Sequence, residues 1–309
     1  MQVEILGTAA GGGFPQWNCA CRNCGRVREG TFPGKARTQL QIAVSSDGHS
    51  WLLLNASPDL SRQIEGSHFL HPKTGIRNSP IFGILLTSGE LDQSLGLLLL
   101  RELEPLGIFA TASVRRILRE NNSMFSMLDR VSDQARWFDI APGAEFEILS
   151  RVGERRGISC LPLSLGNCFP AYVTARRAAE LEASEAVLGL ILRSTSGKRL
   201  GYFPAVSRID QPLLQLLDSL DVLLFDGTFW SDDELNKVGG GAQTARKMGH
   251  IPVSSPEGSL ELLSEVRCPR KMFVHVNNTN PMLDVSGREY HHVYERGWEI
   301  AEDGWHLEL

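Results

Sequence analysis

Three cysteines stand close together near the start of the chain and have the spacing to bind a metal. They are Cys19, Cys21 and Cys24, in the segment Cys-Ala-Cys-Arg-Asn-Cys. Thiolates this close converge on one Zn²⁺ only where the loop wraps around the ion, and tetrahedral zinc then requires a fourth ligand from elsewhere. An iron–sulfur cluster normally takes four cysteines, and a coincidental surface cluster is the remaining alternative. The spacing predicts a zinc-binding loop at about residues 17–25.

Two histidines and an aspartate stand in distinctive surroundings. Asp226 ends an apolar run, and a carboxylate at the end of a buried strand belongs either to a site or to the turn that follows. His275 lies inside an apolar segment, where a lone histidine is more often a core residue. The polar run 277–280 that follows it needs partners, and a cleft supplies them. His250 follows a glycine, and we treat all three as candidate site residues.

A further candidate region, Thr87–Leu97, follows an apolar strand and leads into a helix. Enzymes of the α/β class place ligands at this position in the topology. Glu90, Asp92 and Gln93 either point into one cleft or are solvated turn residues. The glycine-rich segment 7–13 also follows a strand, but its spacing does not match a dinucleotide-binding loop, so we expect a tight turn there.

The elements that must position these residues alternate along the chain. Short apolar segments rich in β-branched residues predict strands, and segments with helical periodicity lie between them. The expected helices are 97–104, 113–131, 211–220, 256–266 and 288–300. This alternation predicts an α/β protein with mixed sheets. The lack of a linker or a repeat favours one domain over residues 1–309.

Composition narrows the function classes. The 309 residues are 42% apolar and 22% charged, with a net charge of −5, which indicates a globular chain and excludes disorder. The pI near 5.9 argues against nucleic-acid binding. The longest apolar runs, such as Leu95–Leu100, are far shorter than the roughly 18 residues of a membrane span. The first residues lack a signal-peptide pattern, so we expect a cytoplasmic protein that does not bind membranes.

The segment Thr87–Leu97 resembles the metal-binding signature of the metallo-β-lactamase superfamily, T-H-x-H-x-D-H-x-x-G-L. The residues of the signature that this sequence keeps are Thr87, Asp92, Gly96 and Leu97. The residues that replace its histidines are Ser88, Glu90 and Gln93. His250 and His275 match later markers of the superfamily, whereas its middle histidine and bridging aspartate are lost near Leu165 and Ala205.

Longer segments resemble one family within this superfamily, the pyrroloquinoline quinone (PQQ) biosynthesis B proteins. The segments are Gly-Gly-Gly-Phe-Pro-Gln-Trp-Asn-Cys at 11–19, Asn-Ala-Ser-Pro-Asp at 55–59 and His-Val-Asn-Asn-Thr-Asn-Pro at 275–281. The resemblance covers essentially the whole chain. It implies an αβ/βα sandwich, in which two mixed sheets lie face to face with helices outside and the site lies at one sheet edge.

The resemblance implies two alternative functions. One is an iron-dependent oxygenase that hydroxylates a tyrosine-derived intermediate during PQQ assembly. The other is a carrier that takes PQQ or its precursor to the periplasm without a catalytic metal. We favour the enzyme, because the sequence offers no export feature, and the missing histidines argue against a hydrolase with two metals. The implied partners are the tyrosine-derived precursor, other PQQ biosynthesis proteins and a second copy of the chain.

The family pattern also implies roles for the candidate residues at the active site. Asp92, Gln93 and His275 are expected to hold the active-site metal, with Fe²⁺ as the ion. Gln93 would bind weakly through its carbonyl oxygen, and the alternative third ligand is His250 or Asp226. Non-haem iron oxygenases use few histidine and carboxylate ligands and keep positions open for oxygen and substrate.

The expected catalytic residues are His250, Asp226 and Glu90. His250 is expected to act as a base whose tautomer Asp226 orients. At the cysteine loop, Asn278 is the expected fourth ligand of a structural Zn²⁺, because it lies three residues after the last histidine; His250 is the alternative.

Overall fold

The structure is a computed structural model that describes residues 1–120, 122–132 and 134–309. The chain divides into two compact units. The first unit contains Met1–Leu6, Gln41–Lys198 and Gly304–Leu309. The second unit contains Gly7–Leu40 and Arg199–Asp303. We describe each unit by itself.

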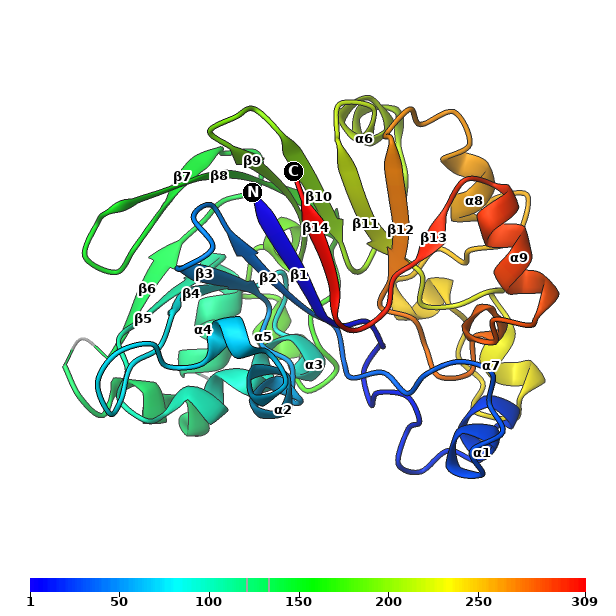
Figure 1. Ribbon diagram of the computed structural model, residues 1–309, viewed down its shortest axis with the longest axis horizontal. Helices are drawn as coiled ribbons and strands as arrows, with labels where there is room; N and C mark the ends of the chain where they lie inside the picture. The colour runs from blue at the N-terminus through cyan, green and yellow to red at the C-terminus, as the bar shows by residue number, and fades with distance from the viewer. Residues whose placement is uncertain (121, 133) are drawn as a thin grey trace. The chain divides into compact units, whose positions relative to one another are not determined.

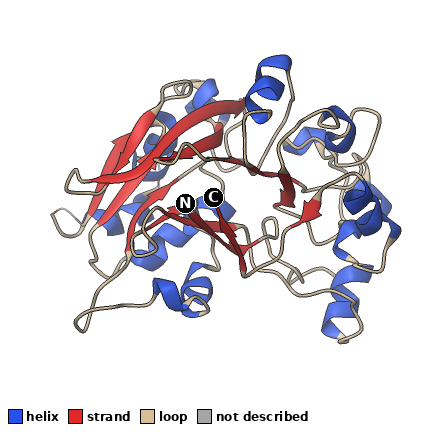
Figure 2. Cartoon of the chain, turned by 45° about the horizontal axis from the view of Figure 1, so that its top comes forward, coloured by secondary structure: helices blue, strands red, loops and turns tan. Residues whose placement is uncertain are grey.

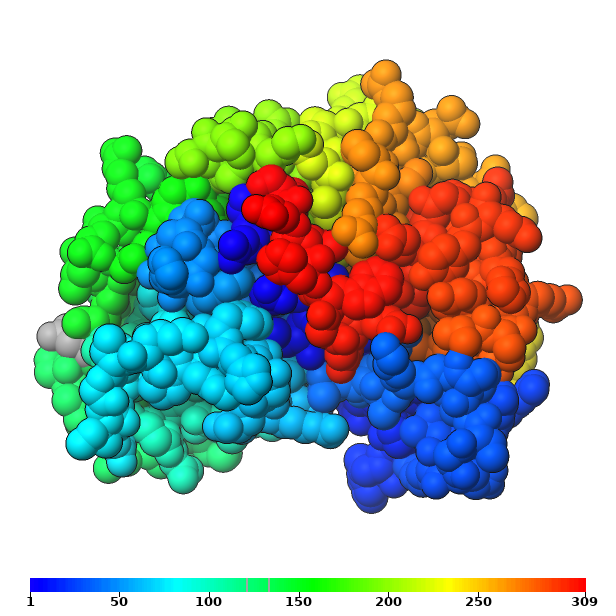
Figure 3. Space-filling model, in the orientation of Figure 1, coloured from blue at the N-terminus to red at the C-terminus, as the bar shows by residue number. Residues whose placement is uncertain are grey.

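The first unit is built around a sheet of seven strands in the order β14-β1-β2-β3-β4-β5-β6 (Figure 1). The strands are β1 (Gln2–Gly7), β2 (Gln41–Ser45), β3 (Trp51–Leu54), β4 (Ile81–Leu85), β5 (Leu106–Ala110), β6 (Ala135–Asp139) and β14 (Trp305–Glu308). β1 and β14 are antiparallel, as are β2 and β3, whereas β3 to β6 run parallel. The two chain ends lie side by side, and Figure 3 shows β14 (red) next to β1 (dark blue) at the surface.

Helices cover one face of this sheet, and an antiparallel strand group lies on the other (Figures 1 and 2). The helices are α2 (Leu60–Glu65), α3 (Leu91–Ser94), α4 (Ala112–Glu120) and α5 (Ala175–Ala178), with 3₁₀ turns at His68–Leu70, Leu95–Leu100, Ser123–Asp129 and Ala183–Glu185. The strand group is β7 (Phe146–Leu149), β8 (Arg155–Gly166) and β9 (Val187–Ser194). Ile117 of α4 packs in one core with Ile84 and Ile108, so α4 lies against β4 and β5. On the opposite face, Phe109 stacks on Phe146 of β7.

The helix predicted over 113–131 is interrupted. It is observed as α4, which ends at Glu120, and a 3₁₀ turn at Ser123–Asp129; residue 121 lies outside the described residues. The turn begins at Asn122, whose side chain accepts a hydrogen bond from the Met124 N–H. An asparagine side chain that bonds its own backbone favours a new helix start over continuation of the old helix.

The second unit contains four parallel strands in the order β13-β12-β11-β10. They are β10 (Arg199–Phe203), β11 (Val222–Asp226), β12 (Arg270–Val274) and β13 (Glu299–Ile300). All residues of β11 are buried, as expected for a strand with parallel neighbours on both sides. The helices are α1 (Arg22–Arg28), α6 (Gln211–Leu217), α7 (Glu234–Lys237), α8 (Ser259–Leu262) and α9 (Arg288–Glu295), with 3₁₀ turns at Arg246–Met248 and Pro281–Leu283.

The helix predicted over 288–300 is too long. α9 ends at Glu295, and Glu299–Ile300 form β13 instead. Gly297 has a φ of 75°, a left-handed conformation that ends a helix and suits glycine. The ring of Trp298 then stacks on Phe273 with centroids 4.4 Å apart.

Together the strands form two mixed sheets of seven strands, and the predicted α/β class with mixed sheets is confirmed. Among the described residues, no helix has both the length and the apolar character that crossing a membrane requires.

Candidate functional site

Adjacent parallel strands bring Asp226 and His275 together in the second unit. Asp226 is the last residue of β11 and pairs in register with Val274, the last residue of β12. His275 follows directly and has a φ of 57°, a conformation that non-glycine residues rarely adopt. Such strained backbone is commonly found where a side chain is held for function.

His250 completes a cluster of three residues around Thr228. The ligand-capable atoms of Asp226, His250 and His275 all lie within 4.8 Å of one another. The two imidazole rings are stacked, with centroids 5.5 Å apart and an interplanar angle of 25°. Asp226 is 0% exposed, His275 5% and His250 9%. The structure therefore brings together the three residues that the sequence singled out separately.

The hydrogen bonds determine which ring nitrogens carry protons. Thr228 Oγ1 lies 2.6 Å from Asp226 Oδ1, and its proton goes to that carboxylate, which has none to donate. His275 Nδ1 lies 2.8 Å from the same hydroxyl oxygen, so His275 Nδ1 must be the donor. His250 Nδ1 lies 2.7 Å from Asp226 Oδ2 and donates to it. Each Nδ1 therefore carries a proton, and in the neutral form of each ring Nε2 holds the lone pair that can bind a metal or accept a proton.

Asp226 is held as a carboxylate by its donors. Burial acts to raise its pKa, but the charge and hydrogen bond of His250, together with the Thr228 hydroxyl, lower the pKa overall. The backbone N–H groups of Val206 and Thr228 also donate to it, at 2.9 and 3.0 Å. With both oxygens occupied by donors, Asp226 is suited to orient the histidines.

Glycine at position 227 is a steric requirement of this site. A Cβ there would lie 2.8 Å from the Phe273 Cβ, so the Asp-Gly-Thr turn packs directly against β12. Thr228 stands in that turn, and it was not among the candidate residues predicted from the sequence. The signal that could have identified it is a hydroxyl two residues after a buried aspartate, in a turn where it can return to the carboxylate.

The turn that follows His275 connects the histidines to the cysteine loop. The Asn277 N–H donates to Thr228 O at 3.0 Å, and the Asn280 side chain donates to Gly227 O at 3.0 Å. Between them, Asn278 reaches the cysteines. The side chain of Asn23, from α1, donates to the backbone oxygens of Asn278 and Asn280 at 3.2 and 3.0 Å.

The cysteine loop has the donor arrangement of a metal site. The three sulfurs lie within 4.8 Å of one another, and the cysteines are not disulfide-bonded. Asn278 Nδ2 lies 3.1, 3.7 and 3.3 Å from the sulfurs of Cys19, Cys21 and Cys24. The end of the Asn278 amide thus occupies the fourth corner of a tetrahedron, and a half-turn of that amide presents its oxygen in place of its nitrogen. These residues fit a tetrahedral zinc ion.

The thiols respond differently to their surroundings. Burial raises the pKa of the Cys21 thiol to about 12. At Cys19, burial also acts to raise the pKa, but hydrogen bonds from Cys21, Asn278 and Cys24 lower it overall. Three thiolates cannot share so small a volume without a cation to offset their repulsion, which is a further reason to expect a metal here.

The signature-like segment lies in the first unit and is internally bonded. Gln93 is buried, and its Oε1 accepts hydrogen bonds from Thr87 at 2.7 Å and Ser88 at 2.9 Å. Both lone pairs of that oxygen are thereby engaged. Asp92 is half-buried in the first turn of α3, and Glu90 is exposed just before it. The pairing of Asp92 and Gln93 with His275 at one metal stays a prediction.

Gly96 explains why the glycine of the signature is kept. A Cβ at this position would lie 2.3 Å from the backbone oxygen of Ser57. The glycine therefore serves the close packing of this turn, whatever residues replace the histidines.

Comparisons with known proteins add to this geometry. Residues 50–276 match the family model described as the beta-lactamase superfamily domain. The chain is 39% identical to coenzyme PQQ synthesis protein B of Pseudomonas protegens and 36% identical to that of Acinetobacter baumannii, and each match covers 100% of both proteins. The crystal structure of Zn²⁺-bound PqqB from Methylobacterium extorquens superposes with a TM-score of 0.92 at 39% identity, over 100% of both chains. A diphosphatase from the PhnP family superposes with a TM-score of 0.67 at 18% identity, over 100% of this chain and 96% of that one, and supports the fold alone.

Proposed function

Because the chain belongs to the coenzyme PQQ synthesis protein B family of the beta-lactamase superfamily, we propose that it is the oxygenase of PQQ biosynthesis that hydroxylates a tyrosine-derived intermediate. Membership of the family confirms the resemblance and the metallo-β-lactamase fold predicted from the sequence. It also links the chain to PQQ biosynthesis.

The observation that carries the proposed reaction is the pairing of His250 with buried Asp226, at 2.7 Å between Nδ1 and Oδ2. A phenol has a pKa near 10, and its anion is far more electron-rich at the ring than the neutral form. In its neutral form His250 accepts the phenolic proton at Nε2, and Asp226 stabilises the imidazolium that results. This assigns His250 as the base and Asp226 as the residue that positions it.

His275 is the residue of the second unit best suited to hold the active-site metal. Its Nδ1 is hydrogen-bonded to Thr228, which fixes the ring and presents the Nε2 lone pair to a metal, as hydrogen-bond partners of metal-binding histidines commonly do. Asp92 and Gln93 are the further ligands that the signature predicts. A redox-active metal such as Fe²⁺ supplies oxidising chemistry with dioxygen when it is bound.

The Cys19, Cys21, Cys24 and Asn278 cluster is the proposed structural zinc site. Its donors are mainly thiolates, which zinc accepts in closed tetrahedral sites. Because Asn278 belongs to the turn that begins at His275, the zinc would hold that turn and the loop at 17–25 in one arrangement. No contact of the described residues favours the carrier alternative.

The experiment that tests the function compares two metal forms of the protein. Protein purified without oxygen is loaded with Fe²⁺ or with Zn²⁺ and then given tyrosine and short tyrosine-containing peptides under ¹⁸O₂. Ascorbate is added as the two-electron reductant, so that one oxygen atom enters the ring and the other leaves as water. We expect a product that has gained one ¹⁸O atom with Fe²⁺ only. If neither metal form yields such a product while a labelled peptide still binds, the result would contradict the oxygenase function and favour the carrier alternative.

A further inference from the structure

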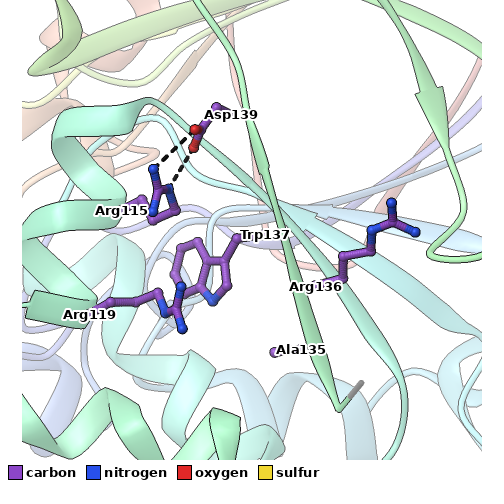
Figure 4. Close-up of a pocket in the computed structure, with 6 residues that line it drawn as sticks. All are labelled: Arg115, Arg119, Ala135, Arg136, Trp137 and Asp139. Atoms are coloured by element: carbon purple, nitrogen blue, oxygen red, sulfur yellow. Dashed lines mark hydrogen bonds and ion pairs between the residues drawn. The ribbon is translucent and has the colours of Figure 1, made fainter. Parts of the chain in front are cut away.

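Strand β6 and helix α4 form a pocket that includes none of the histidine or cysteine residues described above. β6 is the last strand of its sheet. The pocket has a volume of about 510 Å³. Its lining residues, shown in Figure 4, are Arg115 and Arg119 of α4 and Ala135, Arg136, Trp137 and Asp139 of β6.

The outer edge of β6 presents backbone groups for pairing. On the inner side, the Leu106 N–H donates to Gln134 O at 2.8 Å and the Ile140 N–H donates to Ala110 O at 3.0 Å. Because alternate residues of a parallel strand bond to the same neighbour, the N–H and C=O groups of Ala135, Trp137 and Asp139 face away from β5. An outward row of this kind is a template for an added strand.

Cationic side chains flank this edge. Arg115 bonds Asp139 through two nitrogens, at 2.6 and 3.1 Å. Arg119 lies over the ring of Trp137, 6.0 Å from its centroid. Arg119 also pairs with Asp129 at 2.9 Å. The lining residues thus include three arginines and a single carboxylate, and each of the two arginines of α4 already holds an aspartate.

Arg136 places positive charge on the opposite face of the strand. Side chains alternate along a strand, so Arg136 points away from the face shared by Ala135, Trp137 and Asp139. Arg136 is exposed and lies over the ring of Phe138, 5.1 Å from its centroid. A strand added at this edge would therefore meet cations from both faces.

We propose that β6 binds an extended acidic segment of a partner polypeptide as an added strand. Charged side chains alone also protect an edge from aggregation. The pocket beside Trp137 favours a partner, because it leaves room for side chains next to the outward backbone. Carboxylates of the partner then pair with Arg136 and with the arginines of α4, and the indole offers an apolar surface to the residues between them.

The test uses a defined probe with the full-length protein. A fluorescein-labelled hexapeptide of alternating glutamate and valine is titrated, and its fluorescence anisotropy is followed at low and at moderate salt. We expect binding that weakens with salt and that is weaker by roughly tenfold or more for the same peptide with lysine in place of glutamate.

Two variants and a control locate the binding surface. Arg136→Glu reverses a charge at the edge, and Ala135→Pro removes an outward N–H while keeping the bonds to β5. Each should weaken binding by roughly tenfold. The control is Arg155→Glu on β8, another exposed arginine, which pairs with Glu147 at 3.3 Å and lies on a strand with neighbours on both sides. The affinity of this variant should stay within about twofold of that of the unmodified protein. If Ala135→Pro fails to fold, the affinity of Arg136→Glu and the salt dependence of binding still test whether the peptide binds at β6.

Three results would overturn the proposal. Equal binding of the glutamate and lysine peptides, or unchanged binding by Arg136→Glu, would leave the arginines without the proposed role. Displacement of the peptide by free glutamate at equal concentration would make the pocket a site for small carboxylates. A dimer of the unmodified protein that Ala135→Pro abolishes in sedimentation would make the occupant a second copy of the chain.

Discussion

At the scale of single residues, one buried carboxylate controls the tautomers of two histidines. Asp226 contacts His250 directly and His275 through the Thr228 hydroxyl. The arrangement requires that Thr228 and His250 donate to Asp226 and that His275 donates to Thr228. Buried polar groups that are fully bonded are rigid, and the loss of one partner leaves another unsatisfied.

Thr228→Val tests this chain of hydrogen bonds. Valine keeps the shape of threonine but removes the donor to Asp226 and the acceptor for His275. We expect the free energy of unfolding to fall by about 1–3 kcal/mol, measured by urea denaturation, with ¹⁵N NMR reporting mixed tautomers of His275. Thr228→Ser keeps the hydroxyl and should keep a single tautomer. A single tautomer in the valine variant would show that Thr228 does not determine it.

Gln93→His tests whether residue 93 faces the active-site metal. An imidazole is a much better ligand than a neutral amide whose oxygen already accepts two hydrogen bonds. We expect Fe²⁺ to bind about tenfold more tightly or better, measured by anaerobic titration. Adding Asp92→Asn should cancel the gain. Equal iron affinity in Gln93→His and the unmodified protein would show that residue 93 does not contact the metal.

At the scale of elements, the turn between β12 and the 3₁₀ turn at Pro281–Leu283 connects two candidate sites. His275 starts it, Asn278 reaches the three sulfurs, and Thr279 donates to the buried carboxylate of Glu234 in α7. The turn therefore depends on groups from α1, from the residues that follow β11 and from α7. Changes in those elements should be measurable as changes in stability.

Cys21→Ser should release the zinc from the loop at 17–25. A serine oxygen is a poor substitute for a thiolate, and structural zinc contributes folding free energy directly. We expect less than stoichiometric zinc by mass spectrometry and a lower Tm, by about 2–4 °C for each 1 kcal/mol lost. Cys168→Ser, at an exposed and isolated cysteine, should change neither. Stoichiometric zinc in the Cys21→Ser protein would show that the metal does not bind at this loop.

Glu234 predicts a pH dependence of stability. Burial raises its pKa from 4.5 to about 7, although hydrogen bonds from Thr279 and the Trp230 N–H partly oppose this. The folded state therefore keeps the proton while the unfolded state loses it, so stability falls as the pH rises from about 4.5 to 7. At about 1.4 kcal/mol per pKa unit the loss is up to about 3 kcal/mol.

Glu234→Gln should remove that loss, since glutamine keeps an acceptor for Thr279 and carries no charge. The measurement is the difference in unfolding free energy between pH 5 and pH 8, in the variant and the unmodified protein. The exposed substitution Glu65→Gln serves as the control and should leave the difference unchanged. The same difference in Glu234→Gln would exclude Glu234 as its source.

At the scale of the whole molecule, local sequence patterns predict the fold class and the individual site residues. They predict less well which site residues contact one another. Alternating apolar segments predict an α/β protein because strand and helix periods are local. The ends of elements depend on single residues such as Gly297, which separates α9 from β13. The bond between Thr228 and His275 was not predictable, because it forms only when β11 and β12 lie side by side.

The cysteine cluster and the surroundings of Gln93 show the same contrast between what is local in the sequence and what is not. The spacing of Cys19, Cys21 and Cys24 indicates a metal by itself, because the ligands are close in sequence. Gln93 could be recognised as a departure from the signature, but the two hydroxyls that engage its oxygen could not. The single domain predicted over 1–309 stays a prediction, and the chain divides into two compact units.

The most direct test of the account is the rate of hydroxylation by His250→Ala, measured with metal content and Tm on the same sample. The account predicts that turnover falls by about 10²–10⁴, as for loss of a general base, while the metal content is unchanged and the exposed substitution His49→Ala has no effect. Raising the pH should restore part of the rate, because solvent then removes the phenolic proton. Unaltered turnover, or a loss of turnover that follows loss of metal, would contradict the assignment of His250 as the base.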